Sequence, residues 1–243
     1  MKEIIKPYKK DFLYSYAAGA YVTIELLLAR PNHVEKVIIH PDYKDAEHLL
    51  LLCREKSITV QWNERVFKKI NQKENTYVLG QFTKYPCNLS FDAPHIVMVN
   101  PSDMGNLGTI IRTMAGFNIN NLAIITPAAD IWHPKTIRAS MGALFRIEVE
   151  QFTSFEEYRR RYRLHKLYPF MLDGKRRLTL ENCPRGDSRY SLVFGNEAAG
   201  LPEEFCHIGM SIKLPQTEMV DSLNLSVAVG VGAFLFASAN GQI

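Results

Sequence analysis

The chain has 243 residues, 47% of them hydrophobic, so it is long enough to bury a core and to form one large domain or two small ones. Its 29 lysines and arginines against 25 acidic residues give a formal net charge of +4, which permits a polyanionic partner without requiring one. The four cysteines lie far apart with no CxxC pair, which argues against a zinc site or a disulfide framework and favours reduced thiols in a cytoplasmic protein.

Hydrophobic periodicity in residues 1–85 predicts a compact α/β domain. The expected elements are a helix at 13–30, a strand at 34–41, a helix at 45–56, a strand at 57–62, a helix at 63–71 and a strand at 76–82. The lysine-rich start has no apolar stretch behind it, so no secretory signal is expected. Pro86 and Pro94 punctuate a stretch with little periodicity, and residues 86–94 are predicted to be a linker.

Residues 95–243 are predicted to form a second, larger α/β domain. The expected strands are 95–100, 121–126, 145–152, 167–172, 190–195 and 211–215, and the expected helices begin at 107, lie within 134–144, span 154–163 and end the chain. Continuous apolar strands that alternate with helices favour a mostly parallel sheet with helices on both faces. Residues 173–189 are polar and contain Gly and Pro, which predicts a surface loop.

The last 22 residues, from Ser222 to Ile243, carry no charge and are about long enough to cross a bilayer. Asn224, Ser226 and the glycines dilute their hydrophobicity, and no lysine or arginine follows Lys213. A buried helix is therefore preferred to a membrane anchor. Because this helix is apolar all round and has small residues, we expect it to contribute to a subunit interface.

Three strand ends carry the polar residues expected of a binding site. Ligands of parallel α/β sheets bind beyond the carboxyl ends of the strands, so the loops "NPSDMGNLG", "GNEAAGLP" and "PQTEMVDSLN" are expected to meet at one rim. Small residues around Glu197 suit a flat ligand, although this loop alone is equally consistent with a plain strand-to-helix turn. The chain has no GxGxxG, Walker, GxSxG or HExxH motif, which disfavours dehydrogenases, NTPases, serine hydrolases and zincins.

Taken together, the three segments resemble the three motifs of the SpoU/TrmH branch of the SPOUT RNA methyltransferases. The matching stretches are "NP…NLGTIIRT", "LVFGNEAAGL" and "LPQTEMVDSLNLSVA", in the family's order over residues 96–240. Residues 1–85 are similar in layout to the small RNA-binding domain that often precedes this catalytic domain. Two departures stand out, since residues 102–105 replace a usual single residue and Glu218 stands where the family usually has glycine.

The resemblance implies a trefoil-knotted domain that binds S-adenosylmethionine and transfers methyl to a ribose 2′-hydroxyl of structured rRNA or tRNA. It also implies a homodimer formed through this domain, including the last helix, with no metal and no membrane. The implied catalytic residues are Asn106, Arg112, Glu197, Ser222 and Asn224. The implied cofactor-binding residues are Phe194, Gly195, Asn196, Glu197, Gly200, Leu214, Gln216, Ser222 and Leu223. The alternative is a non-catalytic RNA-binding protein that kept the fold.

Arg112 lies among apolar residues at helical spacing, and alone it would be taken for an arginine that reaches to solvent from an apolar face. Together with the other motif residues, Arg112 is interpreted as a residue that takes part in the reaction. The family proposal of a general base is disfavoured because a guanidinium does not readily lose a proton. We therefore predict that Arg112 holds a phosphate and stabilises the developing alkoxide.

Two basic stretches are further candidates for contacts with RNA. The stretch "YRRRYRLHK" at 158–166 interleaves arginines with aromatics, as in some RNA-binding surfaces, but a solvated helix face is the preferred interpretation. Lys6, Lys9 and Lys10 are similar candidates. His133 has no neighbour that suggests a metal or a base, and is predicted to be structural.

Overall fold

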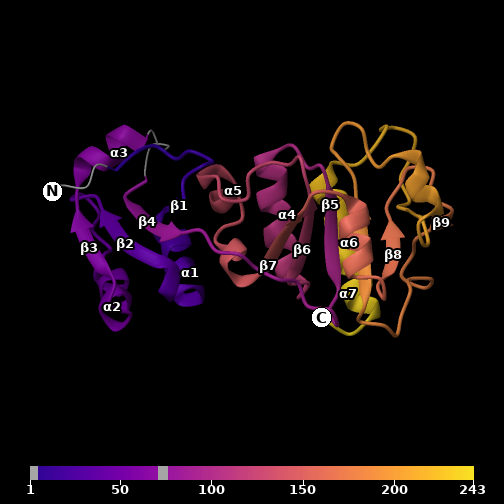
Figure 1. Cartoon of the computed structure of the whole chain (residues 1–243), viewed down its shortest axis with the longest axis horizontal. Coiled ribbons are helices and arrows are strands. Elements are labelled where there is room, and N and C mark those ends of the chain that lie inside the picture. Colours follow the sequence, from indigo (N-terminus) through magenta and orange to yellow (C-terminus); the bar gives the residue numbers. More distant parts are fainter. Residues whose placement is uncertain (1–4, 71–75) are drawn as a thin grey trace. The chain divides into compact units, whose positions relative to one another are not determined.

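The computed structural model describes residues 5–70 and 76–243, and the chain divides into two compact units (Figure 1). The first unit comprises residues 1–85 and 130–146, and the second comprises residues 86–129 and 147–243. Residues 130–146, which the sequence pattern assigns to the second domain, thus belong to the first unit. Two contacts explain this placement, since α5 (Pro134–Ala139) packs against β1 (Tyr14–Ala18), and Arg30 Nε donates to the Phe145 carbonyl at 3.0 Å.

The first unit has a four-stranded mixed sheet in the order β1-β4-β2-β3. β4 is antiparallel to both β1 and β2, whereas β2 and β3 are parallel. Besides β1 and α5, the elements are α1 (Ala20–Ala29), β2 (Val34–Ile39), α2 (Glu47–Glu55), β3 (Thr59–Trp62), α3 (Glu64–Ile70), β4 (Val78–Thr83) and the 3₁₀ helices Pro31–His33 and Ala143–Arg146. Of the helix predicted at 63–71, Asn71 lies outside the described residues.

The helix predicted at 13–30 is wrong over its first part, which forms strand β1. Tyr16 and Ala18 of this strand lie in the core of the first unit, in one cluster with Ile38 and Leu79 of the neighbouring strands. Gly19 then takes a φ of 109°, which a residue with a side chain adopts only with strain, and α1 begins directly after it. The hydrophobic residues of this short Tyr- and Ala-rich stretch show neither a helical nor a strand period, and its strand conformation depends on pairing with β4.

The second unit has a five-stranded, all-parallel sheet in the order β7-β6-β5-β10-β8, which confirms the predicted parallel sheet. Its elements are β5 (His95–Val99), α4 (Met104–Gly116), β6 (Asn121–Ile125), β7 (Glu148–Phe152), α6 (Phe155–Arg161), β8 (Lys166–Pro169), β9 (Arg176–Arg177), β10 (Tyr190–Phe194), the 3₁₀ helix Glu203–His207, β11 (Ile212–Lys213) and α7 (Leu225–Ala239). Within the described residues, no helix is both long and apolar enough to span a membrane.

Helices cover both faces of this sheet. On one face, Val97 and Val193 pack in a cluster with Tyr158 of α6. Successive residues of a strand point to opposite faces, so Phe194 points the other way, where its ring lies against Gly232 of α7. α7 also packs against α4. Because both faces are occupied, a ligand has access to this sheet only at its ends.

Two expectations about the connecting segments are corrected. The predicted surface loop at 173–189 contains β9, and its Leu178 and Cys183 are only 1% and 4% exposed. β11 pairs with β9, where Arg176 N–H donates to the Ser211 carbonyl at 3.1 Å and Leu178 N–H to the Lys213 carbonyl at 2.9 Å. An isolated bridge between Phe170 and Ile212 joins β11 to the chain just after β8, but β11 is not a strand of the main sheet. α4 begins at Met104, earlier than the predicted 107, because Asp103 caps it by accepting from Asn106 N–H at 2.7 Å.

A buried polar network ties the linker to the amino ends of the strands. His95 Nε2 is 2.7 Å from the Ser90 carbonyl and its Nδ1 is 2.8 Å from the Tyr158 hydroxyl. The Ser191 hydroxyl is 2.6 Å from that of Tyr158 and 3.0 Å from His165 Nδ1. Burial, reinforced by the nearby His165 and opposed by the hydrogen bond to Ser90, lowers the pKa of His95 to about 3.

Acidification is expected to destabilise the second unit through His95. The unfolded imidazole takes up a proton near its ordinary pKa of 6.5, whereas the folded one does so only near 3, so stability present above pH 6.5 is lost as the pH falls between these values. The loss is up to about 1.4 kcal/mol per pH unit. Both tryptophans, Trp62 and Trp132, lie in the first unit, so comparing circular dichroism with tryptophan fluorescence in urea isolates the second.

The matched comparison is His95→Gln. This variant should be less stable at neutral pH, because burial leaves the hydroxyl of Tyr158 and the carbonyl of Ser90 with poorer partners. Its unfolding free energy should also depend less steeply on pH between 6 and 5, with the remaining dependence coming from groups such as His165, whose pKa burial also lowers. Equal pH slopes in the two proteins would contradict the assignment.

Candidate active site

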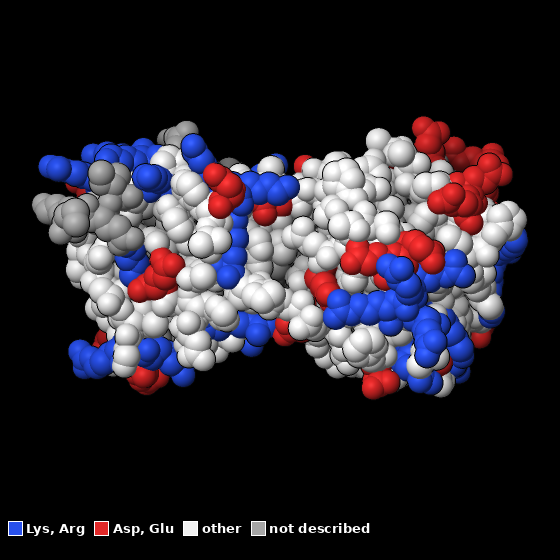
Figure 2. Space-filling model, viewed as in Figure 1, with Lys and Arg blue, Asp and Glu red and all other residues white. Residues whose placement is uncertain are grey.

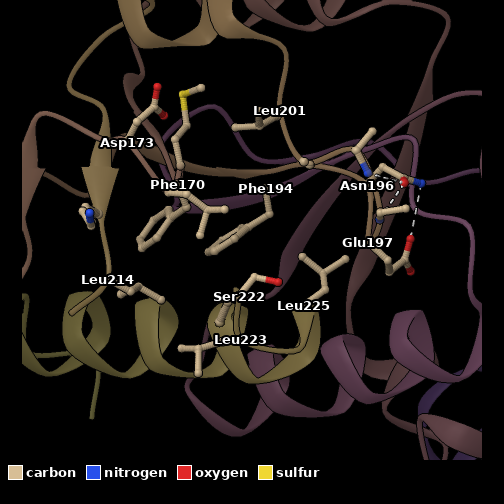
Figure 3. Close-up of a pocket in the computed structure, with 18 of the residues that line it drawn as sticks. Phe170, Asp173, Phe194, Asn196, Glu197, Leu201, Leu214, Ser222, Leu223 and Leu225 are labelled. Carbon is tan, nitrogen blue, oxygen red and sulfur yellow. Dashed lines mark hydrogen bonds between the residues drawn. The ribbon is translucent and has the colours of Figure 1, made fainter. Parts of the chain in front are cut away.

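A cavity of about 310 Å³ opens at the carboxyl ends of β8 and β10, within the second unit (Figure 3). The nine residues predicted to bind a cofactor all line it, namely Phe194, Gly195, Asn196, Glu197, Gly200, Leu214, Gln216, Ser222 and Leu223. They come from the loop after β10 and from the segment between β11 and α7. The two loops therefore meet at one rim, although β11 is not a strand of the main sheet.

Two stacked rings form an apolar wall of the cavity. The rings of Phe170 and Phe194 lie 4.3 Å apart at an angle of 19°, and Figure 3 shows them opposite Leu214 and Leu223. Phe170 and Asp173, which also lines the cavity, were not predicted as site residues. A signal for them existed, because Phe170 lies near the end of the strand predicted at 167–172 and Asp173 directly follows it, and the strand-end rule applies to that strand too.

The loop after β10 is folded so tightly that it requires glycine. A Cβ on Gly195 would lie 2.1 Å from the carbonyl carbon of Gly200, and Gly200 itself has a φ of 66°. Asn196 and Gly200 exchange backbone hydrogen bonds of 3.2 and 3.0 Å, and Asn196 Oδ1 accepts from the Ala198 and Ala199 amides. Small side chains and a close turn leave backbone atoms free to approach a ligand.

The carboxylate of Glu197 joins this loop to the loop after β5. Its Oε2 accepts from the Ser102 amide at 3.0 Å and from the Ser102 hydroxyl at 2.8 Å, and its Oε1 accepts from the Asp103 amide at 3.1 Å. The segment 102–105, which is longer than the corresponding segment usual in the family, thus supplies the N–H and hydroxyl donors that hold Glu197. Asn196 Nδ2 adds a bond of 2.8 Å to the Asn100 carbonyl.

Hydrogen bonding keeps Glu197 ionised. Partial burial raises its pKa, but the bonds from the Ser102 and Asp103 backbone and the Ser102 hydroxyl outweigh burial, so the pKa lies below its ordinary value. This carboxylate is therefore an acceptor that positions two loops, and it is poorly suited to take up a proton at neutral pH.

Glu197→Gln should loosen this joint. The substitution places an amide nitrogen where one acceptor oxygen faces N–H donors, so we expect the second unit to lose about 1–2 kcal/mol of unfolding free energy. Urea unfolding followed by circular dichroism measures this loss. Glu203→Gln, at an exposed position of the same unit, is the matched control and should unfold as the wild type does. A variant at Glu197 as stable as that control would rule out the positioning role.

Asn106 and Asn224 extend the network around Glu197. Asn106 Nδ2 is 3.4 Å from Glu197 Oε1, and Asn224 Nδ2 is 3.4 Å from Asn106 Oδ1. Asn224 also caps α7, since its Oδ1 accepts from the Ser226 amide at 2.9 Å. Ser222 is exposed and lines the cavity. The structure thus brings four of the five predicted catalytic residues to one edge of the sheet.

Arg112 stands apart from this group. It lies on the exposed side of α4, does not line the cavity, and has no hydrogen-bond or ion-pair partner among residues 5–70 and 76–243. Its guanidinium is therefore free to bind an incoming anion, and its catalytic role stays a prediction. His133 is structural as predicted, because its Nδ1 accepts from Lys135 N–H at the start of α5.

Comparisons with known proteins agree with this architecture. The family model described as "SpoU rRNA Methylase family" matches residues 93–234. A protein of Bacillus subtilis named as a putative tRNA (cytidine(34)-2′-O)-methyltransferase is 33% identical over 55% of this chain and 85% of its own length. An uncharacterized tRNA/rRNA methyltransferase of Synechocystis is 27% identical over 64% of this chain, which spans 56% of that protein. The crystal structure of an AdoMet-bound rRNA methyltransferase from Sinorhizobium meliloti superposes with a TM-score of 0.76 at 23% identity, over 93% of this chain and 87% of the other.

Proposed function

The chain belongs to the SpoU rRNA methylase family, and on that premise we propose that it transfers a methyl group from S-adenosylmethionine to a ribose 2′-hydroxyl of rRNA or tRNA. The observation that carries this proposal is the cavity at the carboxyl ends of β8 and β10, where residues of the second and third motifs meet. The two relatives named above, which are described as RNA methyltransferases, support the same reaction class.

The cavity residues fit S-adenosylmethionine. A volume of about 310 Å³ lies within the range of small-molecule sites, at the lower end. Phe194, Leu214 and Leu223 offer apolar surface to a flat base, and the glycine turn offers backbone groups to its edge. Asp173 and Lys213 line the same cavity and carry the charges that would pair with an ammonium and a carboxylate. When bound, the cofactor supplies the electrophilic methyl group.

The residues of this chain would orient the ribose rather than form a covalent bond with it. Asn106, which is bonded to Glu197, and Asn224, which is bonded to Asn106, would present their amide groups to the ribose. Arg112 would bind the neighbouring phosphate and stabilise the oxygen as its proton leaves to phosphate or water. The main requirement of the reaction is that the ribose oxygen approaches in line with the methyl group, and residues that position the ribose meet this requirement.

The proposal includes the family's trefoil knot and an RNA-binding role for residues 1–85. Support for the knot comes from the membership of residues 93–234 in the SpoU rRNA methylase family. A cytoplasmic location, where rRNA and tRNA are found, completes the proposal.

A homodimer formed through the second unit is also part of the proposal. Val227, Val231 and Phe234 make an apolar stripe along α7 and are 50%, 38% and 44% exposed within one chain. Their spacing puts them on one side of the helix, and a second copy would cover them. Sedimentation should give twice the chain mass of 27.8 kDa, and Phe234→Glu should reduce it to that of one chain.

Methyl transfer is tested with RNA from cells that lack this protein. Incubation of total RNA with S-adenosylmethionine should produce new alkali-resistant linkages, because a methylated 2′-hydroxyl cannot attack its phosphate. Calorimetry with S-adenosylmethionine should show binding to the protein alone. No binding at high micromolar cofactor would overturn the proposal in favour of a non-catalytic RNA-binding protein with this fold.

A further inference from the structure

The second unit carries a basic groove at the opposite end of its sheet from the cofactor cavity. The groove has a volume of about 680 Å³ and is formed by α6, the turn after it, the start of β8, and Gly209 and Met210. Four cationic side chains line it, namely Arg159, Arg160, Arg163 and Lys166. Figure 2 shows blue side chains gathered over the region where Figure 1 places α6 and β8.

These cations are available to a ligand. Within the described residues, Arg160 and Arg163 have no hydrogen-bond or ion-pair partner. Arg159 Nη1 is 3.9 Å from Glu156 Oε2, and Lys166 Nζ is 3.4 Å from Asp187 Oδ2. All four of these paired side chains have solvent-exposed surface, and exposed pairs of this kind contribute little. Positive charge therefore exceeds negative charge in the groove.

The dipole of α6 does not by itself account for the four cationic side chains of the groove. The carboxyl end of α6 attracts cations through the helix dipole, which explains arginines in its last turn. Arg163 and Lys166 lie beyond the end of α6, and yet they face the same groove. Arg161 of the same run is different, because it is bound to Glu150 and its Nη2 donates to Asn88 Oδ1 at 3.3 Å.

The aromatic residues of this stretch indicate what the groove would recognise. Tyr158 and Tyr162 are 0% and 2% exposed, because their four-residue spacing places both rings in the core. Their faces are therefore closed to stacking with bases, contrary to the pattern of interleaved aromatics in the sequence. Tyr162 and Tyr168 line the groove but are only 2% and 6% exposed, so the groove offers charge without an open aromatic face for a base to stack on, which fits phosphates.

We propose that this groove binds the phosphate backbone of the substrate RNA at a distance from the methylated nucleotide. The inference rests on the proposed function for the identity of the polyanion. Lys166 is the first residue of β8 and Phe170, in the cavity wall, follows its last, so roughly 13 Å of strand separates the two sites. The segment 209–214 connects them, with Met210 in the groove, Lys213 and Leu214 in the cavity, and Arg176 Nη1 at 3.3 Å from Met210 Sδ.

The test is the double substitution Arg160→Gln with Arg163→Gln in the full chain. Arg177→Gln with Arg185→Gln, at exposed positions of the second unit that line neither the groove nor the cavity, removes the same charge elsewhere and serves as control. Binding of fluorescent unfractionated tRNA and of ribosomal RNA is measured by anisotropy from about 50 to 200 mM salt. The groove variant should bind about tenfold more weakly, and its slope of log affinity against log salt should fall by about 1.4, or 0.7 for each lost phosphate contact.

Two further measurements separate this proposal from the function it rests on. Affinity for S-adenosylmethionine and turnover at saturating RNA should be unchanged in the groove variant, because its residues do not line the cavity. If the wild-type protein did not methylate RNA, but the groove variant bound RNA more weakly and with a smaller salt slope, the groove proposal would be supported and the proposed function would be contradicted. An unchanged slope overturns the groove proposal, as does an effect confined to binding of anionic phospholipid vesicles.

Discussion

Replacing Arg112 by lysine is expected to lower turnover at saturating RNA by about 100-fold or more. A guanidinium can hold a phosphate through two parallel N–H bonds while still donating to the reacting oxygen, whereas an ammonium is a single compact charge. Because Arg112 has no hydrogen-bond or ion-pair partner among residues 5–70 and 76–243, its replacement breaks no such interaction there. The expected effect therefore concerns the reaction and leaves folding unchanged.

Single-turnover methylation with excess protein measures this effect directly. S-adenosylmethionine affinity should be the same in both proteins, since Arg112 does not line the cavity. Arg112→Gln should be at least as slow as the lysine variant, because it lacks the charge as well as the fork. Nearly full turnover by the lysine variant would show that Arg112 does not stabilise the developing alkoxide.

Gly195→Ala is expected to abolish cofactor binding in the accessible concentration range. The added Cβ would lie 2.1 Å from the carbonyl carbon and 2.2 Å from the carbonyl oxygen of Gly200, and both are backbone atoms with no rotamer to change. The loop after β10 would have to open, which moves Asn196 and Glu197 away from the loop after β5. We expect S-adenosylmethionine affinity to fall by about 100-fold or more, because a loss of about 3 kcal/mol of binding free energy has this effect.

Calorimetry with S-adenosylmethionine measures this loss. Gly116→Ala, at the end of α4, is the matched control, because a Cβ there would meet no atom within 4 Å. It should bind the cofactor as the wild type does. Retained affinity in Gly195→Ala, with an intact circular dichroism spectrum, would show that the tight turn is not required at the site.

The elements that could be predicted from sequence are those whose pattern is local. The apolar strands of the second unit and their helices follow from periodicity, and the parallel sheet follows from their alternation. Strand β1 was missed because its five residues form a strand only by pairing with β4. Leu178 was assigned to a surface loop because its neighbour in the fold, the segment around Lys213, lies more than thirty residues later in the chain.

The site was predictable to a similar extent. The strand-end rule together with the family resemblance identified residues that line the cavity. The bonds that Ser102 and Asp103 donate to Glu197 could not be predicted, because both residues lie in 102–105, one of the two departures from the family pattern. Asp103 is a capping residue in the sequence that favours the earlier start of α4.

The first unit is discontinuous, and this affects how the protein is made and divided. Residues 130–146 complete it, with α5 against β1 and Arg30 bonded to Phe145. During synthesis the ribosome must therefore release β5, α4 and β6 before the first unit has all of its parts. A fragment cut after Tyr85 would lack that closing piece, so an isolated amino-terminal domain has to include residues 130–146, joined by a short artificial connection.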